Sequence, residues 1–323
     1  MNLEVIWSVE ITTPRKTYGL AVMAECEIEK SVKNLADRAT IIIPEYFLNK
    51  KIDFDGMVER GDQIRIKFGY KGLIYETEFE GYIREINSNG GNLTVECEDA
   101  LFLFRKDVAD KQFTNAGMAT IAQYLLAQVG EGLALDCDYP ITYEKFTIHR
   151  ATAYDVLKKL QEETGADIYF EDNTLHIHPA YIRKGADVAF SPQQNIEKFS
   201  LEYKKATDRK VEVTVERVGL DGKVESFTTG QPGGEKITKK VTTMDAKSIR
   251  IIAENEYRQR MTDGYEGSFE SWAYPQVLPG DTVSITDEDY RERDSSYYVD
   301  SVKTKFSPSG IVRTVELGIK LSA

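Results

Sequence analysis

The stretch VERGDQIRI (58–66) and the stretch VLPGDTVSI (277–285) share the pattern V-x-x-G-D-x-(I/V)-x-I, 219 positions apart. A Gly-Asp pair is typical of turns, because glycine tolerates positive φ and aspartate can bond to its own backbone. The residues after each pair alternate between apolar and polar, which indicates a half-buried strand. Each copy therefore predicts a turn that leads into a strand, at Ile64 in the first copy and at Val283 in the second.

The similarity between the two stretches continues along the chain. FEGYIREI (79–86) and GGNLTVECEDAL (90–101) follow the first copy, and SSYYVDSV (295–302) and SGIVRTVELGIKL (309–321) follow the second. The order of turns and strands is the same, and both last strands contain Thr-Val-Glu, at 94–96 and 314–316. Two unrelated β meanders could also give this pattern. The interpretation we favour is a pair of related β domains flanking a different segment.

Length and composition are those of a folded protein of two or three domains, with 323 residues, 41% hydrophobic and 29% charged. The formal net charge of −12 argues against binding to duplex DNA or to an anionic membrane through a basic face. No apolar run reaches the roughly 18 residues of a membrane span, and we expect neither membrane insertion nor a signal peptide. Three scattered cysteines, Cys26, Cys97 and Cys137, are expected to be small core residues in a reducing compartment.

The order of strand and helix patterns predicts a mainly β protein with a small α/β insert. We expect a first β domain at 1–106, the insert at 107–182, and a second β domain at 183–323 with one helix at about 245–262. Strand patterns such as ATIIIP (39–44) and NLTVEC (92–97) dominate the first domain. In the second domain, a hairpin is expected at 209–229, with its turn at Asp221 and Gly222.

Helical periodicity and capping residues predict three helices. The helix at 114–130 should bury one face, formed by Ile121, Ala122, Leu125, Leu126 and Val129. A helix at 152–165 should begin with a capping box of Thr152 and Asp155 and end at Gly165, and a hairpin at 166–179 with Asp172 and Asn173 in its turn should follow. The helix at 244–264 should be capped by Asp245 and end at Gly264, with an apolar face of Ile249, Ile252, Ala253, Tyr257 and Met261.

The sequence contains no pattern that requires an enzyme. His176 and His178 should share a strand face and could ligate zinc, but no third ligand is indicated nearby, so we predict a solvated face and no metal. His149 has no identifiable partner, and Asp287, Glu288 and Asp289 are expected to form a solvated loop rather than a glycosidase pair. We find no Walker A motif, no G-x-S-x-G and no nucleophile–base set. The prediction is therefore no catalytic residues, no cofactor and no metal.

The order of parts resembles the baseplate hub proteins of contractile phage tails, namely the late control D family and the hub part of type VI secretion spike proteins. SIRIIAENEYRQRM (248–261), SFESWAYPQVLPGDTVSI (268–285), SYYVDSV (296–302) and TVELGIKL (314–321) carry the most specific match. TAYDVLKKLQEETGADIYFEDNTLHIHP (152–179) resembles the family's insert. The resemblance covers nearly the whole chain. One departure is Lys303-Thr304-Lys305, where many relatives place a histidine.

The resemblance implies a structural role. In that family the two β domains are tube-forming barrels, so a homotrimer presents a pseudo-sixfold ring that joins a sixfold tail tube to a threefold spike. The implied partners are the tail spike protein, the tail tube protein and other baseplate proteins, with DNA passing through the channel without specific binding. The implied location is the virion tail baseplate, assembled in the cytoplasm of a bacterial host.

Other interpretations remain open from the sequence. One is a tail tube, distal tail or secretion component, and another is a cell-wall hydrolase fused to a tail protein. The helix and hairpin at 152–177 also resemble small modules of secretins and outer-membrane receptors. Phage, defective prophage and secretion device are not distinguished by these residues.

Overall fold

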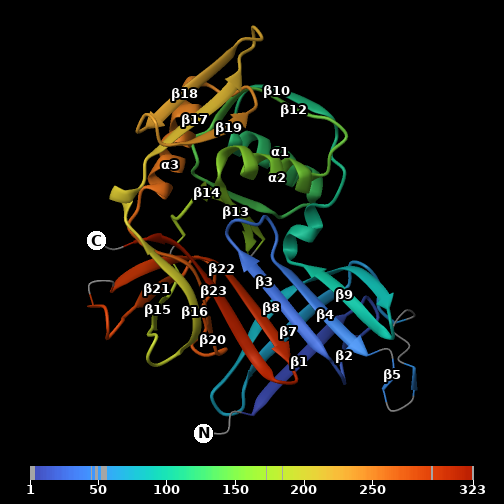
Figure 1. Cartoon of the computed structure of the whole chain (residues 1–323). Helices are drawn as coiled ribbons and strands as arrows, with labels where there is room; N and C mark the ends of the chain where they lie inside the picture. Colours follow the sequence, from blue (N-terminus) through green and yellow to red (C-terminus); the bar gives the residue numbers. More distant parts are fainter. Residues whose placement is uncertain are drawn as a thin grey trace.

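The computed structural model describes residues 4–44, 46–47, 50–51, 57–171, 173–183, 185–291 and 294–321. The architecture is mainly β with an α/β insert, as the sequence predicts (Figure 1). The first β unit contains β1 (Val5–Thr12), β2 (Thr17–Gly19), β3 (Glu25–Ser31), β4 (Arg38–Pro44), β5 (Tyr46–Phe47), β6 (Lys50–Lys51), β7 (Gln63–Tyr70), β8 (Ile74–Asn89) and β9 (Asn92–Glu98). The short helix η1 (Ala100–Phe104) leads from this unit into the insert.

The insert combines two helices with two small sheets. It contains β10 (Lys111–Gly117), α1 (Met118–Val129), β11 (Ala134–Cys137), β12 (Thr142–Ile148), α2 (Ala153–Thr164), β13 (Ala166–Glu171) and β14 (Thr174–Pro179). Strand β10 pairs with β12, and β14 lies between β11 and β13.

The second β unit is interrupted by a subdomain. The unit contains β15 (Asp187–Phe190), β16 (Ile196–Lys204), β20 (Gly264–Ser271), β21 (Thr282–Ile285), β22 (Ser295–Ser307) and β23 (Gly310–Lys320). Between β16 and β20 the chain forms η2 (Ala206–Asp208), β17 (Val211–Val218), β18 (Val224–Gly230), β19 (Glu235–Val241) and α3 (Ala246–Arg260). The predicted hairpin around Asp221 and Gly222 is confirmed as the β17–β18 pair.

The two Gly-Asp turns have the same backbone geometry. Gly61 has a φ of 95° and Gly280 a φ of 89°, a region that favours glycine. Gly61 N donates to Ile83 O, and Gly280 N donates to Val299 O, each at 2.9 Å. The predicted equivalence of the two turns is therefore confirmed in the backbone.

The aspartates of the two turns also make matching hydrogen bonds. Asp62 O accepts from Ile83 N at 2.9 Å, and Asp281 O accepts from Val299 N at 3.0 Å. Each carboxylate closes its turn by accepting from the backbone N–H three residues earlier, at 2.8 Å for Asp62 and 2.7 Å for Asp281. Because these aspartates are buried, each repeat uses its carboxylate to satisfy turn donors that water does not reach.

The strand registers extend the equivalence through both units. The order β3-β4-β9-β8-β7 in the first unit corresponds to β16-β20-β23-β22-β21 in the second. The β8–β9 pair skips Arg84, and the β22–β23 pair skips Asp300, so a bulge occupies the same place in both. The Thr-Val-Glu segments then occupy the same register, with Val95 opposite Ile86 and Val315 opposite Val302.

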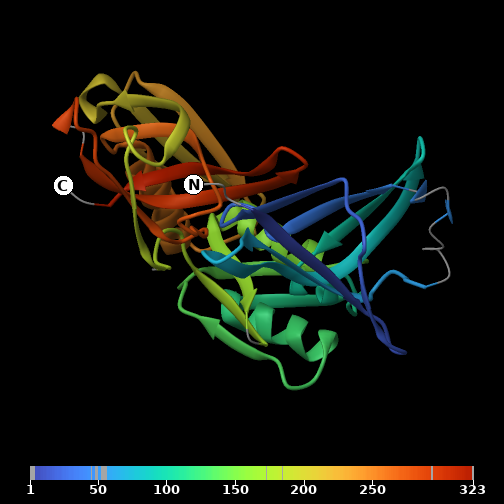
Figure 2. The same ribbon diagram turned by 90° about the horizontal axis from the view of Figure 1, so that it is seen from below.

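The two β units differ in their remaining strands. Strand β1 pairs with β7 antiparallel, whereas β15 pairs with β21 parallel. Strand β4 follows β3 directly, whereas the subdomain β17–α3 separates β16 from β20. Strands of both β units nevertheless lie in one sheet, which has thirteen strands in the described residues. Figures 1 and 2 show the two units side by side, with the insert packed against one end.

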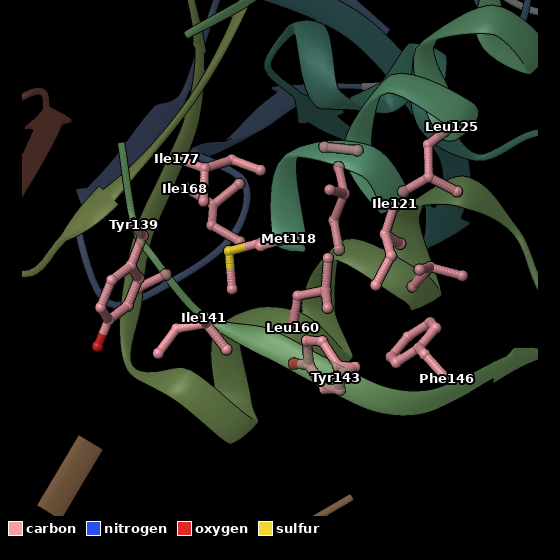
Figure 3. Packing of buried hydrophobic residues seen from close by; sticks show 14 of the residues in the cluster. Met118, Ile121, Leu125, Tyr139, Ile141, Tyr143, Phe146, Leu160, Ile168 and Ile177 are labelled. Atoms are coloured by element: carbon pink, nitrogen blue, oxygen red, sulfur yellow. The ribbon is translucent and has the colours of Figure 1, made fainter. Parts of the chain in front are cut away.

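Three clusters of buried apolar side chains hold the fold together. One fills the first β unit and includes Phe306 and Ile311 of the second, and another lies inside the second unit. The third and largest centres on the insert, where α1, α2, β12, β13, β14 and the segment between β11 and β12 supply the labelled side chains in Figure 3. Val213, Met244 and Ile252 of the subdomain belong to this third cluster, although they fall within the segment 183–323 expected to form the second β domain. The predicted domain boundaries remain predictions, and the subdomain packs on the insert.

The helices agree with the sequence in their buried faces and differ at some ends. The predicted face of the first helix is buried, and Thr152 and Asp155 form the expected capping box of the second. The helix predicted from 114 begins at Met118, because Lys111–Gly117 forms β10 instead. The prediction that Gly264 ends the third helix is wrong: Met261 is the C-cap, and Gly264 begins β20, where it pairs with Lys204 of β16. Glycine fits at this position because a Cβ would meet the Tyr297 ring at 2.8 Å.

The remaining sequence predictions on local structure have mixed outcomes. Strands β13 and β14 form the predicted hairpin; Asn173 lies in its turn, and Asp172 lies outside the described residues. Asp245 caps α3 by accepting from Ser248 N. Among the described residues, no helix is long and apolar enough to cross a membrane.

Candidate assembly surface and side-chain clusters

Strand β22 joins the two β units through one of its edges. Its first half pairs on that edge with β21, and its second half pairs with β3, from Ser301 opposite Ser31 to Phe306 opposite Cys26. The backbone N–H and C=O groups of β22 that extend past the end of β21 are therefore hydrogen-bonded by β3 of the other β unit. The junction is an edge-to-edge strand pairing, which gives a rigid and directional contact.

The two faces of this junction differ in polarity. On one face Cys26, Ile28 and Phe306 are buried, and the rings of Phe306 and Phe68 stack at 5.4 Å. On the other face Lys303 pairs with Glu27 at 2.8 Å, and the Nζ of Lys305 lies 3.7 Å from Glu25. The apolar face supplies the stabilisation, because exposed ion pairs contribute only about 0–1 kcal/mol each.

The matching edges on the other strands of the sheet have no strand partner among the described residues. In the correspondence of the two units, β8 is equivalent to β22, and β16 is equivalent to β3. The edges equivalent to the β22–β3 junction are therefore the end of β8 and the outer edge of β16. Strand β7 pairs with β8 only as far as Tyr82, and β16 is an outer strand of the sheet in the described residues. Phe199 on β16 is 58% exposed, whereas Cys26 at the matching place on β3 is fully buried.

Acidic side chains predominate on the solvent face of the sheet. The acidic residues of this face are Glu25, Glu27, Glu29, Glu85, Glu96, Glu202, Glu266, Glu270 and Glu316. The basic residues include Arg38, Lys198, Lys204, Lys303 and Lys305, and Arg84 at the β8 bulge pairs with Glu96 and Glu98 on this face. This face therefore repels polyanions more than it attracts them.

Buried carboxyl groups gather where the first β unit meets the insert. A cleft of about 400 Å³ there is lined by residues that include Asp37, Asp99, Asp167 and Arg183. Burial raises the pKa of Asp37 and of Asp99, whose carboxyl groups lie close enough to disfavour each other's charge. Burial also raises the pKa of Asp167 to about 6, and its Oδ2 has no hydrogen-bond partner. Burial therefore favours the neutral, protonated forms of these carboxyl groups, and the nearby Arg183 opposes that effect at Asp37 and Asp167.

The structure gives His176 and His178 a third neighbour that the sequence did not indicate. Asp136 on β11 lies opposite His176 on β14, and donor atoms of the three residues all lie within 4.8 Å of one another. Strand β11 pairs parallel to β14 across 40 positions of sequence, so no short motif connects them. The alternation of Leu135 and Cys137 with Asp136 and Asp138 was the available signal of a strand with an acidic face.

The other residues singled out from the sequence make local contacts. His149 is exposed, and its Nδ1 lies 2.5 Å from Asp110, the partner that the sequence did not identify. Glu288 and Asp289 are exposed as predicted, but the prediction of a solvated Asp287 is wrong. Asp287 is 7% exposed, because its carboxylate accepts from the N–H groups of Asp289 and Tyr290 and closes the turn after β21.

The cysteines lie where the sequence placed them. Cys26 and Cys97 are buried in the core of the first β unit, and Cys137 is half-buried on β11. Burial raises the pKa of all three thiols, which keeps them protonated and unreactive at neutral pH.

Comparison with known proteins identifies the fold. A tail protein from Neisseria meningitidis has a TM-score of 0.65 and 15% identity, over 97% of this chain and 96% of that one. The 43 kDa tail protein of prophage MuSo2 from Shewanella oneidensis has a TM-score of 0.66 and 14% identity, over 97% and 98%. This chain has a phage tail protein fold. The similarity spans both β units and the insert.

The same fold occurs in secretion machinery. An Escherichia coli component of the type VI secretion system, described as similar to bacteriophage T4 tail proteins gp27 and gp5, has a TM-score of 0.59 and 12% identity, over 99% of this chain and 77% of that one. A chain of the Francisella PdpA–VgrG complex has a TM-score of 0.56 over 98% of this chain. Among sequence comparisons, no family model and no curated protein matches.

Proposed function

We propose that the chain is the structural baseplate hub of a contractile tail or injection machine. In this role three copies form an adapter between a sixfold tail tube and a threefold spike, and they enclose a channel for DNA or protein cargo. The single observation that carries the proposal is the edge-to-edge junction of two equivalent β units within one chain. A phage tail protein fold supports the same role.

The internal junction supplies a template for contacts between copies. If β8 of one copy pairs with β16 of the next as β22 pairs with β3, each copy uses a head-to-tail contact. Such contacts generate a closed ring when the rotation between neighbours closes, and we propose that it closes after three copies. Three copies then present six equivalent β units to a sixfold tube and three identical inserts to a spike. The partners are a second and third copy of this chain, the tail tube, the spike and other baseplate proteins.

The side chains of the free edges are compatible with this pairing. Transferring the β22–β3 register sets Glu85 opposite Lys204 and Ile86 opposite Tyr203 of the neighbouring copy. The same transfer gives exposed Phe199 the place of buried Cys26. A charge pair and a newly covered aromatic ring both favour association, and aromatic side chains are frequent anchors at interfaces.

The proposed channel face is the acidic solvent face of the sheet. Glu residues outnumber Lys and Arg on it, so duplex DNA would pass without being held. In this proposal the role is structural rather than enzymatic. It acts in the tail baseplate of a particle assembled in the host cytoplasm, and the fold supports a phage, a prophage or a secretion device equally.

Cysteine crosslinking tests the proposed ring directly. We expect the double variant Glu85→Cys/Lys204→Cys to give a ladder of disulfide-linked species ending at the trimer on mild oxidation. The matched control Glu85→Cys/Lys198→Cys moves one thiol six positions along β16 and should not crosslink. Native mass spectrometry of the untreated protein at high concentration should show trimers, which Phe199→Glu removes and Leu220→Glu, on an exposed hairpin tip, does not.

The same measurements separate the alternatives. Six-membered rings or fibres would favour a tail tube or distal tail protein. Equal crosslinking in the two double variants, or a monomer at every concentration with and without the spike, would contradict the hub proposal. Release of fragments from peptidoglycan would favour the hydrolase alternative.

A further inference from the structure

The cluster of Asp136, His176 and His178 has the donor spacing of a metal site. His176 Nδ1 lies 3.2 Å from Asp136 Oδ2, and His178 Nε2 lies 3.5 Å from the same oxygen. Two ligands at about 2.0–2.1 Å from a tetrahedral zinc ion are about 3.3 Å apart, so both distances match those of bound donors. The two histidine side chains are 21% and 14% exposed, and that of Asp136 is 56% exposed, which leaves an open side for water.

A fourth residue orients one of the histidines. Asp138 Oδ1 lies 2.6 Å from His178 Nδ1, and since a carboxylate only accepts, Nδ1 carries the hydrogen. In the neutral ring Nε2 then carries a lone pair, and it faces the Asp136 oxygen. Two acceptors that face each other require a positive charge between them, which either a proton on Nε2 or a metal ion supplies. A carboxylate that fixes the far nitrogen of a ligating histidine is a common feature of zinc sites.

The remaining histidine is also held in place. The ring of Tyr169 stacks on that of His176, with 4.6 Å between centroids and 9° between planes. The Arg183 guanidinium lies over the Tyr169 ring, and Glu171, 3.3 Å from Arg183, offsets the charge of the guanidinium. The two histidines are therefore pre-oriented, which lowers the entropy cost of binding an ion.

We propose that Asp136, His176 and His178 form a divalent transition-metal site, which Zn²⁺ fits by ligand type. Two imidazoles and one carboxylate suit Zn²⁺, and also Co²⁺ or Ni²⁺, better than Mg²⁺ or Ca²⁺. The sequence prediction of no metal depended on the lack of a third ligand, which Asp136 now supplies. The inference is independent of the proposed hub function.

Such an ion would act on the stability of the insert. Strand β11 has β14 as its partner in the described residues, at one side of a small sheet. An ion bound by Asp136 on β11 and by both histidines on β14 would clamp the two strands together. Anything that binds the folded state and not the unfolded state raises the melting temperature.

The test uses the full chain without an affinity tag, freed of metal with a chelator. Isothermal titration with ZnCl₂ near neutral pH should show one ion per chain, and Co²⁺ should give the visible bands of a nitrogen- and oxygen-ligated site. We expect His176→Gln and His178→Gln each to weaken binding at least tenfold, and Asp138→Asn to weaken it about tenfold through the orientation of His178.

A matched control is available at the second histidine–aspartate pair. His149 contacts Asp110 as His178 contacts Asp138, but no other histidine lies in that pair, so His149→Gln should leave zinc binding unchanged. Circular dichroism checks that each variant folds. Failure of the wild-type chain to bind Zn²⁺ or Co²⁺ overturns the proposal, and so does equal binding by His176→Gln/His178→Gln.

Discussion

Arg313 on β23 and Glu78 on β8 form a buried ion pair across the junction of the two β units. Arg313 Nη2 donates to Glu78 Oε1 at 2.6 Å, and the two side chains are 0% and 6% exposed. Arg313 Nη1 also donates to Ala273 O at 2.7 Å, so the guanidinium is satisfied by partners from both units. The contact connects residues 235 positions apart and complements the strand pairing of β22 with β3.

Removal of one partner of this pair should destabilise the protein strongly. Arg313→Met leaves the Glu78 carboxylate buried and unpaired, and we expect a loss of about 3–5 kcal/mol in the free energy of unfolding. The double variant Glu78→Leu/Arg313→Met should be more stable than Arg313→Met, because no uncompensated charge is left. Urea denaturation measures both. Equal stability of Arg313→Met and the wild-type chain would show that the pair does not hold the units together.

The two turn glycines should both resist substitution. Gly61→Ala and Gly280→Ala put a Cβ on residues with φ near 90°, and we expect each to cost about 1–2 kcal/mol in the free energy of unfolding. Gly280 should suffer more, since its Cβ would meet Arg183 Cδ at 3.0 Å, whereas at Gly61 the nearest atom is at 3.9 Å. Gly19→Ala is the control, because no atom lies within 4 Å and its φ is not positive. A silent Gly280→Ala would contradict the argument from φ.

The sequence predicted the repeat because its evidence is local. A Gly-Asp turn followed by alternating residues is determined by φ preferences and pleat period within nine residues, and the structure confirms Gly61 and Gly280 as equivalent. The capping box of Thr152 and Asp155 is equally local. These predictions required no knowledge of what packs against them.

The candidate sites escaped prediction because they depend on long-range contacts. The parallel pairing of β11 with β14 brings Asp136 to His176, and no spacing rule connects strands 40 positions apart. Gly264 resembles a helix end, yet pairing with Lys204 of β16, 60 positions earlier, makes it the first residue of a strand. The subdomain β17–α3 follows β16 in sequence but shares the core of the insert.

Asp167 should make stability depend on pH. Burial raises its pKa to about 6, above the value of about 3.9 expected in the unfolded chain. Below pH of about 4 the carboxyl is protonated in both states, and as the pH rises through about 6 the folded state must hold a buried charge. The contribution of Asp167 to the free energy of unfolding therefore falls over this range, by an amount on the order of 1–3 kcal/mol.

The variant Asp167→Asn isolates this effect. The difference in stability between Asp167→Asn and the wild-type chain should shift in favour of the variant as the pH rises from about 4 to about 7. Thermal denaturation across that range measures the shift, and Asp187→Asn, at an exposed carboxylate on β15, is the control. A constant difference between variant and wild type would exclude Asp167 as the source. The test is the change with pH of the stability difference between variant and wild type, not the difference at a single pH.

The acidic sheet face should determine how the assembled ring treats DNA. Three copies carry a formal charge of about −36, three times the −12 of one chain. If Glu29, Glu96 and Glu316 line the channel, their replacement by Lys should make the trimer retain linear duplex DNA in a salt-dependent way, because added cations release counterions from phosphate.

A control with Glu131, Glu235 and Glu254 replaced by Lys changes the charge equally, but at exposed positions outside the two β units. Gel retardation at several salt concentrations compares the two. Equal retention by both variants would mean that net charge alone acts, and retention by the wild-type trimer would remove the explanation of why this face is acidic.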